Sequence, residues 1–217
     1  IVDTPSGPMQ ATAYMHNGKV ESVAIQMVPS FVYGDNETLS VPEFGQLTVA
    51  TVCVGGFFVM ISTDQIGLDF SPPNRDRLKE LGMQLIHEAN QQLTVHHPTR
   101  PEVKTVDVTE FYDPSSDAAG KGKSMVILGE GHMDRSPCGT GTTAKMTLLH
   151  HQGELKAGDT YQNAGPLGTV FQGRIVKEVA VGPLAGIVGR IQGSAQMIGA
   201  HQFVLDTRDS FPEGFLL

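Results

Sequence analysis

The chain has 217 residues, of which 40% are hydrophobic and 18% charged, and its formal net charge is −8 at pH 7. This composition is typical of a folded globular protein and excludes a chain that is disordered throughout. A negative charge argues against a nucleic-acid partner, and we expect no membrane partner because no apolar run has bilayer-spanning length. With only two cysteines, Cys53 and Cys138, we expect free thiols in a reducing cytoplasm.

Apolar and β-branched runs predict strands at 20–28, 47–60, 125–128, 169–179 and 187–205. Glycines interrupt the last run, so we expect more than one strand there. The run 49–60 is almost continuously apolar, which predicts a strand buried on both faces. Gly55 and Gly56 within it indicate a bulge or a close backbone approach.

Two helices are predicted. The first follows Asn74, a good N-cap residue, has leucines at helical spacing, and should end near Leu93 because Pro98 favours extended structure before it. The second begins after Cys138 and ends at Gly153. Its small polar face predicts a mostly buried central helix. The small, polar segment 113–123 is expected to be a flexible loop.

The most informative stretch is 134–143, Asp-Arg-Ser-Pro-Cys-Gly-Thr-Gly-Thr-Thr. Amides at a helix start bind anions, and the helix dipole there favours a thiolate at Cys138. A small amino or carboxylic acid held by the amides of 139–142 would bring its α-carbon beside the Cys138 sulfur. A thiolate there can take a proton from that carbon, and a thiol can return one. The alternative is that Cys138 is a buried small hydrophobic residue in a structural turn.

Neighbouring residues leave further alternatives open. Asp134 can pair with a substrate ammonium or cap a turn, and Arg135 can bind a carboxylate or form a surface ion pair. His132 is the one nearby base that a nucleophilic hydrolase would use with Cys138. Cys53 lies within an apolar run and is predicted to be a core residue.

The sequence carries no sign of a cofactor or a metal. It has neither a dinucleotide-binding glycine fingerprint nor a P-loop. The histidine pairs at 96–97 and 150–151 are adjacent, so their rings point to different sides and make poor chelates. With no zinc-like spacing either, we expect no cofactor and no metal site.

The motif around Cys138 resembles the second-cysteine motif of the proline racemase and hydroxyproline epimerase family. Other family-like segments follow in family order over essentially the whole chain: 3–7, 28–31, 55–56, 97–98, 168–173 and 214–215. Segments 104–107 and 149–156 are more similar to bacterial proline racemases than to the epimerases.

The resemblance implies a cofactor-independent reaction on a small-molecule substrate, proline or hydroxyproline. Two cysteines on opposite sides of the α-carbon exchange its proton. Cys138 matches the second catalytic cysteine, Asp134 the aspartate that meets the substrate nitrogen, and Gly139 and Thr140 the amides that hold the carboxylate. Related hydroxyproline dehydratases have threonine in place of the second cysteine, so Cys138 favours racemisation or epimerisation.

The family's fold is similar to that of diaminopimelate epimerase, an α/β fold of the α+β type with two similar halves, each a sheet wrapped around a central helix. We expect residues 1–18 to end the first half-domain, 19–192 to form the second, and 193–217 to return to the first. The resemblance also implies a homodimer.

Several features of this chain differ from the family pattern. The family's first cysteine lies in a Met-Cys-Gly-His motif upstream of the segment 3–5, and Cys53 does not match it. We therefore expect an N-terminal part of the protein to be missing and this chain to be inactive alone. Phe57, Ala50 and Leu128 replace residues common in the family, the last at a pocket-lining position, which leaves substrate identity open. A 4-hydroxyproline 2-epimerase and a non-catalytic binding protein or inactive fragment remain alternatives.

Overall fold

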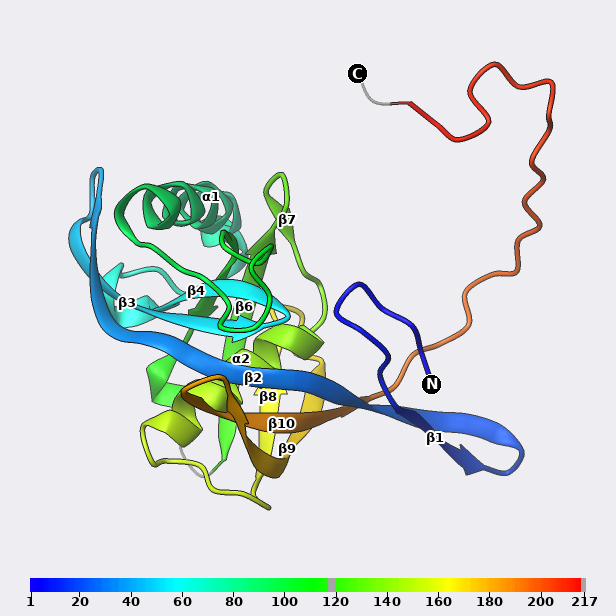
Figure 1. Ribbon diagram of the computed structural model, residues 1–217, viewed down its shortest axis with the longest axis horizontal. Coiled ribbons are helices and arrows are strands. Elements are labelled where there is room, and N and C mark those ends of the chain that lie inside the picture. The colour runs from blue at the N-terminus through cyan, green and yellow to red at the C-terminus, as the bar shows by residue number, and fades with distance from the viewer. Residues whose placement is uncertain (117–119, 216–217) are drawn as a thin grey trace.

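The computed structural model describes residues 1–116 and 120–215, in which there are two α-helices, α1 (Arg75–Gln92) and α2 (Gly139–His151). The strands of this part are β1 (Ala11–His16), β2 (Lys19–Val41), β3 (Gly45–Val54), β4 (Gly56–Ser62), β5 (Val106–Tyr112), β6 (Lys121–Leu128), β7 (His132–Met133), β8 (Thr160–Ala164), β9 (Val170–Val181) and β10 (Leu184–Gly193). Figure 1 shows them in one body, from which the β1–β2 hairpin projects.

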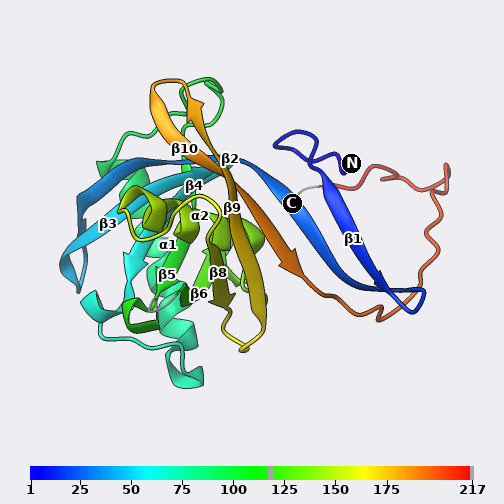
Figure 2. The same cartoon turned by 90° about the horizontal axis from the view of Figure 1, so that it is seen from below.

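The sheet closes on itself around α2. Hydrogen-bonded neighbours follow the order β1-β2-β10-β9-β8-β6-β5-β4-β3, and β3 pairs again with β2. The β4–β5 and β6–β8 pairs are parallel. Helix α2 packs against β2, β3, β9 and β10 inside this sheet, whereas α1 lies on its outer side against β5 (Figure 2). The expected α+β architecture, a mixed sheet wrapped around a central helix, is confirmed.

Two hydrophobic clusters occupy the two faces of the sheet. The outer cluster joins the sheet to α1, and the inner cluster joins it to α2. Successive residues of a strand point to opposite faces, so in β3 Cys53 belongs to the outer cluster while Val52 and Val54 belong to the inner one. This arrangement explains why the run 49–60 is almost continuously apolar, and it confirms burial on both faces.

The same run forms two antiparallel strands, and the prediction of one strand was wrong. The chain reverses at Gly55, where Val54 pairs with Gly56 across the turn. Gly55 has a φ of +78°, and the Ser6 side chain lies directly against it. The predicted close approach is therefore confirmed, and the positive φ favours glycine at 55.

The remaining strand predictions hold except at the C-terminal end. Segments 20–28, 125–128 and 169–179 lie in or largely in β2, β6 and β9. The run 187–205 contributes only to β10, which ends at Gly193, and no second strand follows within the described residues up to 215. Segment 194–205 is apolar enough for a strand, but none of its residues pairs with a strand edge.

Both helix predictions are confirmed, with one correction at a cap. Helix α1 ends at Gln92, next to the expected Leu93, and α2 is buried from Gly141 to Leu149. Asn74 is the N-cap of α1, but its side chain donates to the Asp69 carboxylate and does not cap the helix. The predicted loop 113–123 is shorter than expected because β6 begins at Lys121; its residues 117–119 lie outside the described residues.

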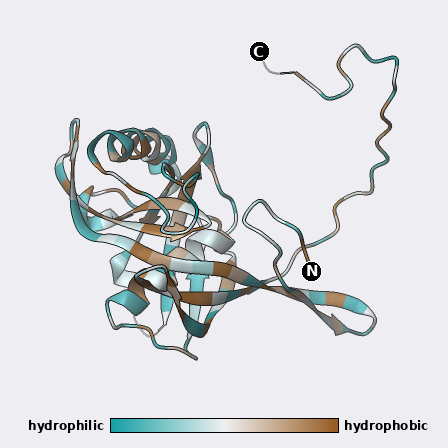
Figure 3. Ribbon diagram, in the orientation of Figure 1, coloured by the Kyte–Doolittle hydropathy of each residue, from teal (hydrophilic) through white to brown (hydrophobic). Residues whose placement is uncertain are grey.

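The C-terminal segment 194–215 runs outside the folded body in both views (Figures 1 and 2). Figure 3 shows hydrophobic stretches along it. Its large apolar side chains are exposed, among them Met197, Ile198, Phe203, Val204 and Leu205. In the part of the chain that the structure describes, no helix is both long and apolar enough to cross a membrane.

Candidate active site

Cys138 is the N-cap residue of α2, and the surrounding backbone holds its sulfur in place. The Gly141 backbone N–H donates to the Cys138 Sγ at 3.3 Å, and the Thr140 Oγ1 lies 3.4 Å from the same sulfur in a second hydrogen bond. The Cys138 N–H donates in turn to the Ser136 Oγ at 3.0 Å. Cys138 has a φ of +60°, a conformation that is costly for a residue with a β-carbon.

Buried polar contacts fix the turn that precedes Cys138. The Asn163 side-chain amide donates to the Pro137 carbonyl oxygen at 3.2 Å and to the Thr142 hydroxyl oxygen at 3.0 Å. The Thr142 hydroxyl also donates to the Pro137 carbonyl at 3.1 Å. Gly165 lies against this turn so closely that a β-carbon on it would come within 2.8 Å of the Pro137 nitrogen. The turn and its cysteine are therefore held in a defined position at the start of a buried helix.

Burial raises the pKa of the Cys138 thiol to about 12. The hydrogen bonds from Thr140 and Gly141 lower the pKa, and the carboxylates of Glu110 and Asp134 raise it. The hydrogen bonds at the helix start act in the direction expected from the sequence, but desolvation of the charged form outweighs them, so the net preference is for the thiol. Cys138 is a thiol at neutral pH.

The four site residues predicted from the sequence line one cavity of about 730 Å³: Asp134, Cys138, Gly139 and Thr140. Its opposite wall is largely apolar and includes Ile25, Met27, Phe171 and Ile191. Arg135 and His132 are exposed and are not among the lining residues. The cavity thus joins a sulfur, a carboxylate and the amides of a helix start.

Asp134 fits both interpretations that the sequence allowed. Its Oδ1 accepts a hydrogen bond from the Ser136 backbone N–H at 2.8 Å, which is a turn-capping contact. The residue nevertheless lines the cavity beside Cys138. A carboxylate has further lone pairs, so capping the turn leaves it able to accept from a substrate ammonium.

Cys53 is fully buried in the outer hydrophobic cluster, so its predicted core role is confirmed. Burial raises the pKa of its thiol to about 12. Cys53 and Cys138 are both free cysteines, as expected.

Two buried charged residues next to the site were not identified from the sequence. Glu110 on β5 is fully buried, and a β-carbon on Gly141 would lie 3.3 Å from its Oε2. Lys145 on α2 is also buried, with its Nζ 3.6 Å from the centre of the Tyr112 ring. The available signal was the position of each charge directly beside apolar residues, Glu110 before Phe111 and Lys145 between Ala144 and Met146. Among the described residues, no three His, Cys, Asp or Glu side chains are gathered as metal ligands.

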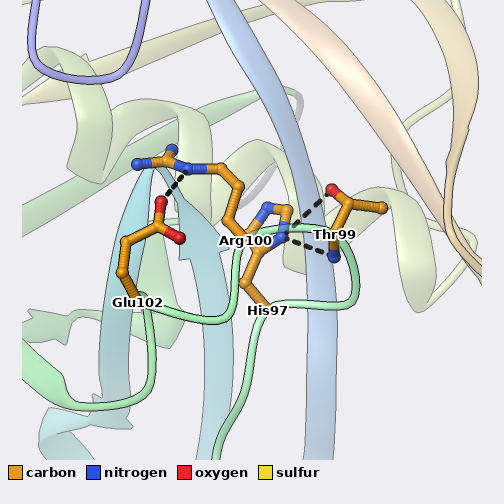
Figure 4. A network of polar contacts seen from close by, with 4 residues as sticks. All are labelled: His97, Thr99, Arg100 and Glu102. Carbon is orange, nitrogen blue, oxygen red and sulfur yellow. Dashed lines mark hydrogen bonds and ion pairs between the residues drawn. The ribbon is translucent and has the colours of Figure 1, made fainter.

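The predicted separation of the adjacent histidines is confirmed. His96 contacts the Tyr33 hydroxyl at 2.8 Å, while His97 is buried with its ring edge-on to Phe31. The His97 Nδ1 accepts from the Thr99 backbone N–H at 3.2 Å (Figure 4). Burial, and to a smaller extent the charge of Arg100, lowers the pKa of His97. This histidine supports the loop after α1 and does not line the Cys138 cavity.

Comparison with known proteins decides the family. The proline racemase family model matches residues 1–216. The chain belongs to the proline racemase family. Proline racemase from Clostridioides difficile is 37% identical over 217 residues, which are 100% of this chain and 65% of that protein. Proline racemase A from Trypanosoma cruzi is 35% identical over 234 residues, covering 100% of this chain and 55% of that protein.

Epimerases of the same family are as similar to this chain as the racemases are. The 4-hydroxyproline 2-epimerase from Streptosporangium roseum is 37% identical over 216 residues, covering 100% of this chain and 65% of that protein. The crystal structure of a hydroxyproline epimerase from Agrobacterium vitis, with bound trans-4-hydroxy-L-proline, superposes with a TM-score of 0.88 at 32% identity, covering 99% of this chain and 61% of that one. A probable proline racemase from Agrobacterium radiobacter K84, with bound carbonate, gives a TM-score of 0.88 at 32% identity, covering 99% and 63%.

These likenesses confirm the diaminopimelate-epimerase-like fold of this proline racemase family member. The chain spans about 65% or less of the length of the curated relatives it matches.

The structure shows where two residues that depart from the family pattern lie. Phe57 is fully buried in the outer cluster, and Leu128 is half-exposed on β6 and is not among the residues that line the Cys138 cavity. The expectation that Leu128 lines the substrate pocket is not supported by this chain.

Proposed function

We propose that this chain is the part of an amino-acid racemase that carries one of two proton-transfer groups, and that the whole protein interconverts L- and D-proline. The observation that supports this most directly is the shared cavity of Cys138, Asp134, Gly139 and Thr140. Membership of the proline racemase family supports the same reaction class.

The cavity can orient an α-amino acid without a cofactor. The substrate carboxylate accepts from the amides of Gly139 and Thr140, where the dipole of α2 favours an anion. The substrate ammonium donates to the Asp134 carboxylate. These two contacts direct the α-carbon toward the Cys138 sulfur, which gives a proton to the α-carbanion as a thiol and removes one as a thiolate.

Racemisation needs a second proton-transfer group on the opposite face of the α-carbon. Cys53 is the other cysteine of this chain, and it is buried in the outer cluster. We therefore propose that the second group comes from outside these 217 residues, in the part of the relatives that this chain does not match. The exposed apolar side chains of segment 194–215 are suited to packing against that part. We also propose that the complete protein is a homodimer.

A 4-hydroxyproline 2-epimerase is the second candidate within the same class. The epimerases from Streptosporangium roseum and Agrobacterium vitis are as similar to this chain in sequence identity as the racemases are, so identity supports both candidates equally. Turnover of L-proline and trans-4-hydroxy-L-proline by one preparation decides between them. A candidate from another class is a non-catalytic binding protein. It is supported by the fact that the described part of this chain offers Cys138 no second proton-transfer group.

The decisive experiment follows the optical rotation of L-proline with the full-length protein that contains this chain. We expect racemisation, and we expect Cys138→Ser to reduce it by at least about 100-fold, because removing a positioned acid–base group costs that much or more. Cys53→Ala is the matched control and should keep activity. A full-length protein that leaves both imino acids unchanged contradicts the proposal. Turnover by the 217-residue chain alone, lost in Cys138→Ser, would overturn the requirement for an outside group.

A further inference from the structure

Glu110 is a buried carboxylate that the reaction outlined above does not use. It comes from β5 and lies directly under the first turn of α2, since its Oε2 would be 3.3 Å from a β-carbon on Gly141. Gly141 is the residue whose N–H donates to the Cys138 sulfur. One glycine therefore separates a buried carboxylate from the proposed proton-transfer group.

The other charged side chains near Cys138 and Glu110 come from the turn before α2, from β2 and from α2 itself. Asp134 faces Cys138 from the turn before α2, and Glu21 of β2 lines the same cavity. Lys145 lies four residues after Gly141, one turn further along the same face of α2. Its ammonium rests on the Tyr112 ring, two residues after Glu110 on the same face of β5. The positive charges on this side of α2 are the buried Lys145 ammonium and the partial charge of the helix N-terminus.

We propose that Glu110 is a positioning residue for proton transfer: its carboxylate, buried under the first turn of α2, adds to the effect of burial in keeping Cys138 in the thiol form. A negative charge at this depth is poorly screened, so it opposes a second negative charge on the nearby sulfur. The direction agrees with the contribution of Glu110 to the raised pKa of Cys138.

The consequence for catalysis rests on the proposed function. With Cys138 protonated at rest, this face of the site acts first as the proton donor. The S–H bond of Cys138 breaks, the electron pair of the α-carbanion forms the new C–H bond, and a thiolate remains. The proton lost by the substrate goes to the outside group on the other face. The reverse reaction returns each proton to its origin.

The test measures the thiol itself and does not require turnover. The 217-residue chain is alkylated with iodoacetamide between pH 7 and pH 10, and mass spectrometry of the peptides separates the Cys138 adduct from that of Cys53. Because the thiolate is the reactive form, Glu110→Gln should increase the Cys138 alkylation rate at pH 8 by about tenfold, equivalent to a pKa lower by about one unit. Glu110→Asp keeps a carboxylate and should remain close to the wild type.

Removal of one buried charge can impair folding, so a second variant is part of the design. Glu110→Gln combined with Lys145→Met removes both charges and is expected to fold and to alkylate faster than the wild type. The proposal is overturned if either folded variant alkylates at the wild-type rate across the pH range, or if Glu110→Asp reacts as fast as Glu110→Gln. A rate increase in a protein that fails to racemise either imino acid would refute the proposed function and leave the charge effect of Glu110 intact.

Discussion

Gly141 and Cys138 constrain each other at the start of α2. The Gly141 N–H donates to the Cys138 Sγ at 3.3 Å, while a β-carbon on Gly141 would lie 2.8 Å from the Val126 Cγ2 and 3.1 Å from the Cys138 Cβ. The helix can therefore approach β6 closely enough to bury the sulfur only if residue 141 has no side chain.

Substitution of that glycine should destabilise the fold. Gly141→Ala forces the first turn of α2 away from Val126, and we expect the free energy of unfolding to fall by about 1–3 kcal/mol, the usual cost of overpacking a core. Urea unfolding measures the change. Gly139→Ala is the matched control: no atom lies within 4 Å of its β-carbon position, so its stability should stay within about 1 kcal/mol of wild type. Equal losses in the two variants would contradict the packing argument.

Alkaline pH should destabilise the protein through its two thiols. Burial raises the pKa of both Cys53 and Cys138 from 9.0 to about 12. Between these values the unfolded chain has lost the two protons and the folded chain has kept them, so stability is complete below about pH 9 and declines above it. Each thiol contributes a slope of about 1.4 kcal/mol per pH unit.

Chemical unfolding between pH 8 and pH 10.5 tests this slope. Cys53→Ala and Cys138→Ala should each remove roughly half of it, whatever their stability at pH 8. A slope unchanged in both variants would show that other groups cause the alkaline decline.

Acid should act through His97. Burial lowers the pKa of this imidazole from its ordinary 6.5, so the unfolded chain binds the proton more readily than the folded one. Its stabilising contribution is complete above pH 6.5 and is lost as the pH falls below that value. His97→Asn keeps an acceptor for the Thr99 N–H (Figure 4) but does not titrate, so its unfolding free energy should fall less between pH 7 and pH 5. Identical acid sensitivity in both proteins would exclude His97 as the source.

Deletion of residues 194–217 should leave the stability of this chain unchanged within about 0.5 kcal/mol, because Ile198 is 100% exposed and Met197 93% exposed. Fluorescence of a dye that binds apolar surface should decrease in the shortened protein. Ile191→Ala, at a buried site in β10 two residues before the end of that strand, is the control and should cost about 2–5 kcal/mol. A large loss of stability on deletion would mean that the segment packs against the body in solution.

Local patterns explain what could be predicted from the sequence. Leu78, Leu81 and Leu85 repeat at helical spacing, and all three are buried on one face of α1. The site residues from Asp134 to Thr140 are neighbours in the chain, so one turn at a helix start was enough to bring them together. Contacts from Asn163 and Gly165, which are distant in the sequence, then hold this turn in place.

Non-local contacts explain what could not be predicted. Glu110 reaches the site because β5 runs beneath α2, and no short pattern encodes that pairing. Segment 194–205 has the composition of a strand, but a strand also needs an open edge to pair with, which composition does not reveal. The pKa-lowering contacts at the start of α2 were anticipated from the sequence, whereas the burial that outweighs them depends on the sheet that surrounds α2.

Strand β2 pairs with β1 at its start, with β10 along 23–31 and with β3 from Ser30 onward. A single strand therefore belongs both to the projecting hairpin and to the closed sheet. Amide hydrogens near Ser30 and Phe31, flanked on both sides, should exchange with solvent only on global unfolding, while those near Lys19 should exchange by opening of the hairpin alone. Along these 23 residues the chain is therefore expected to pass from readily opened to protected backbone, without a break in secondary structure.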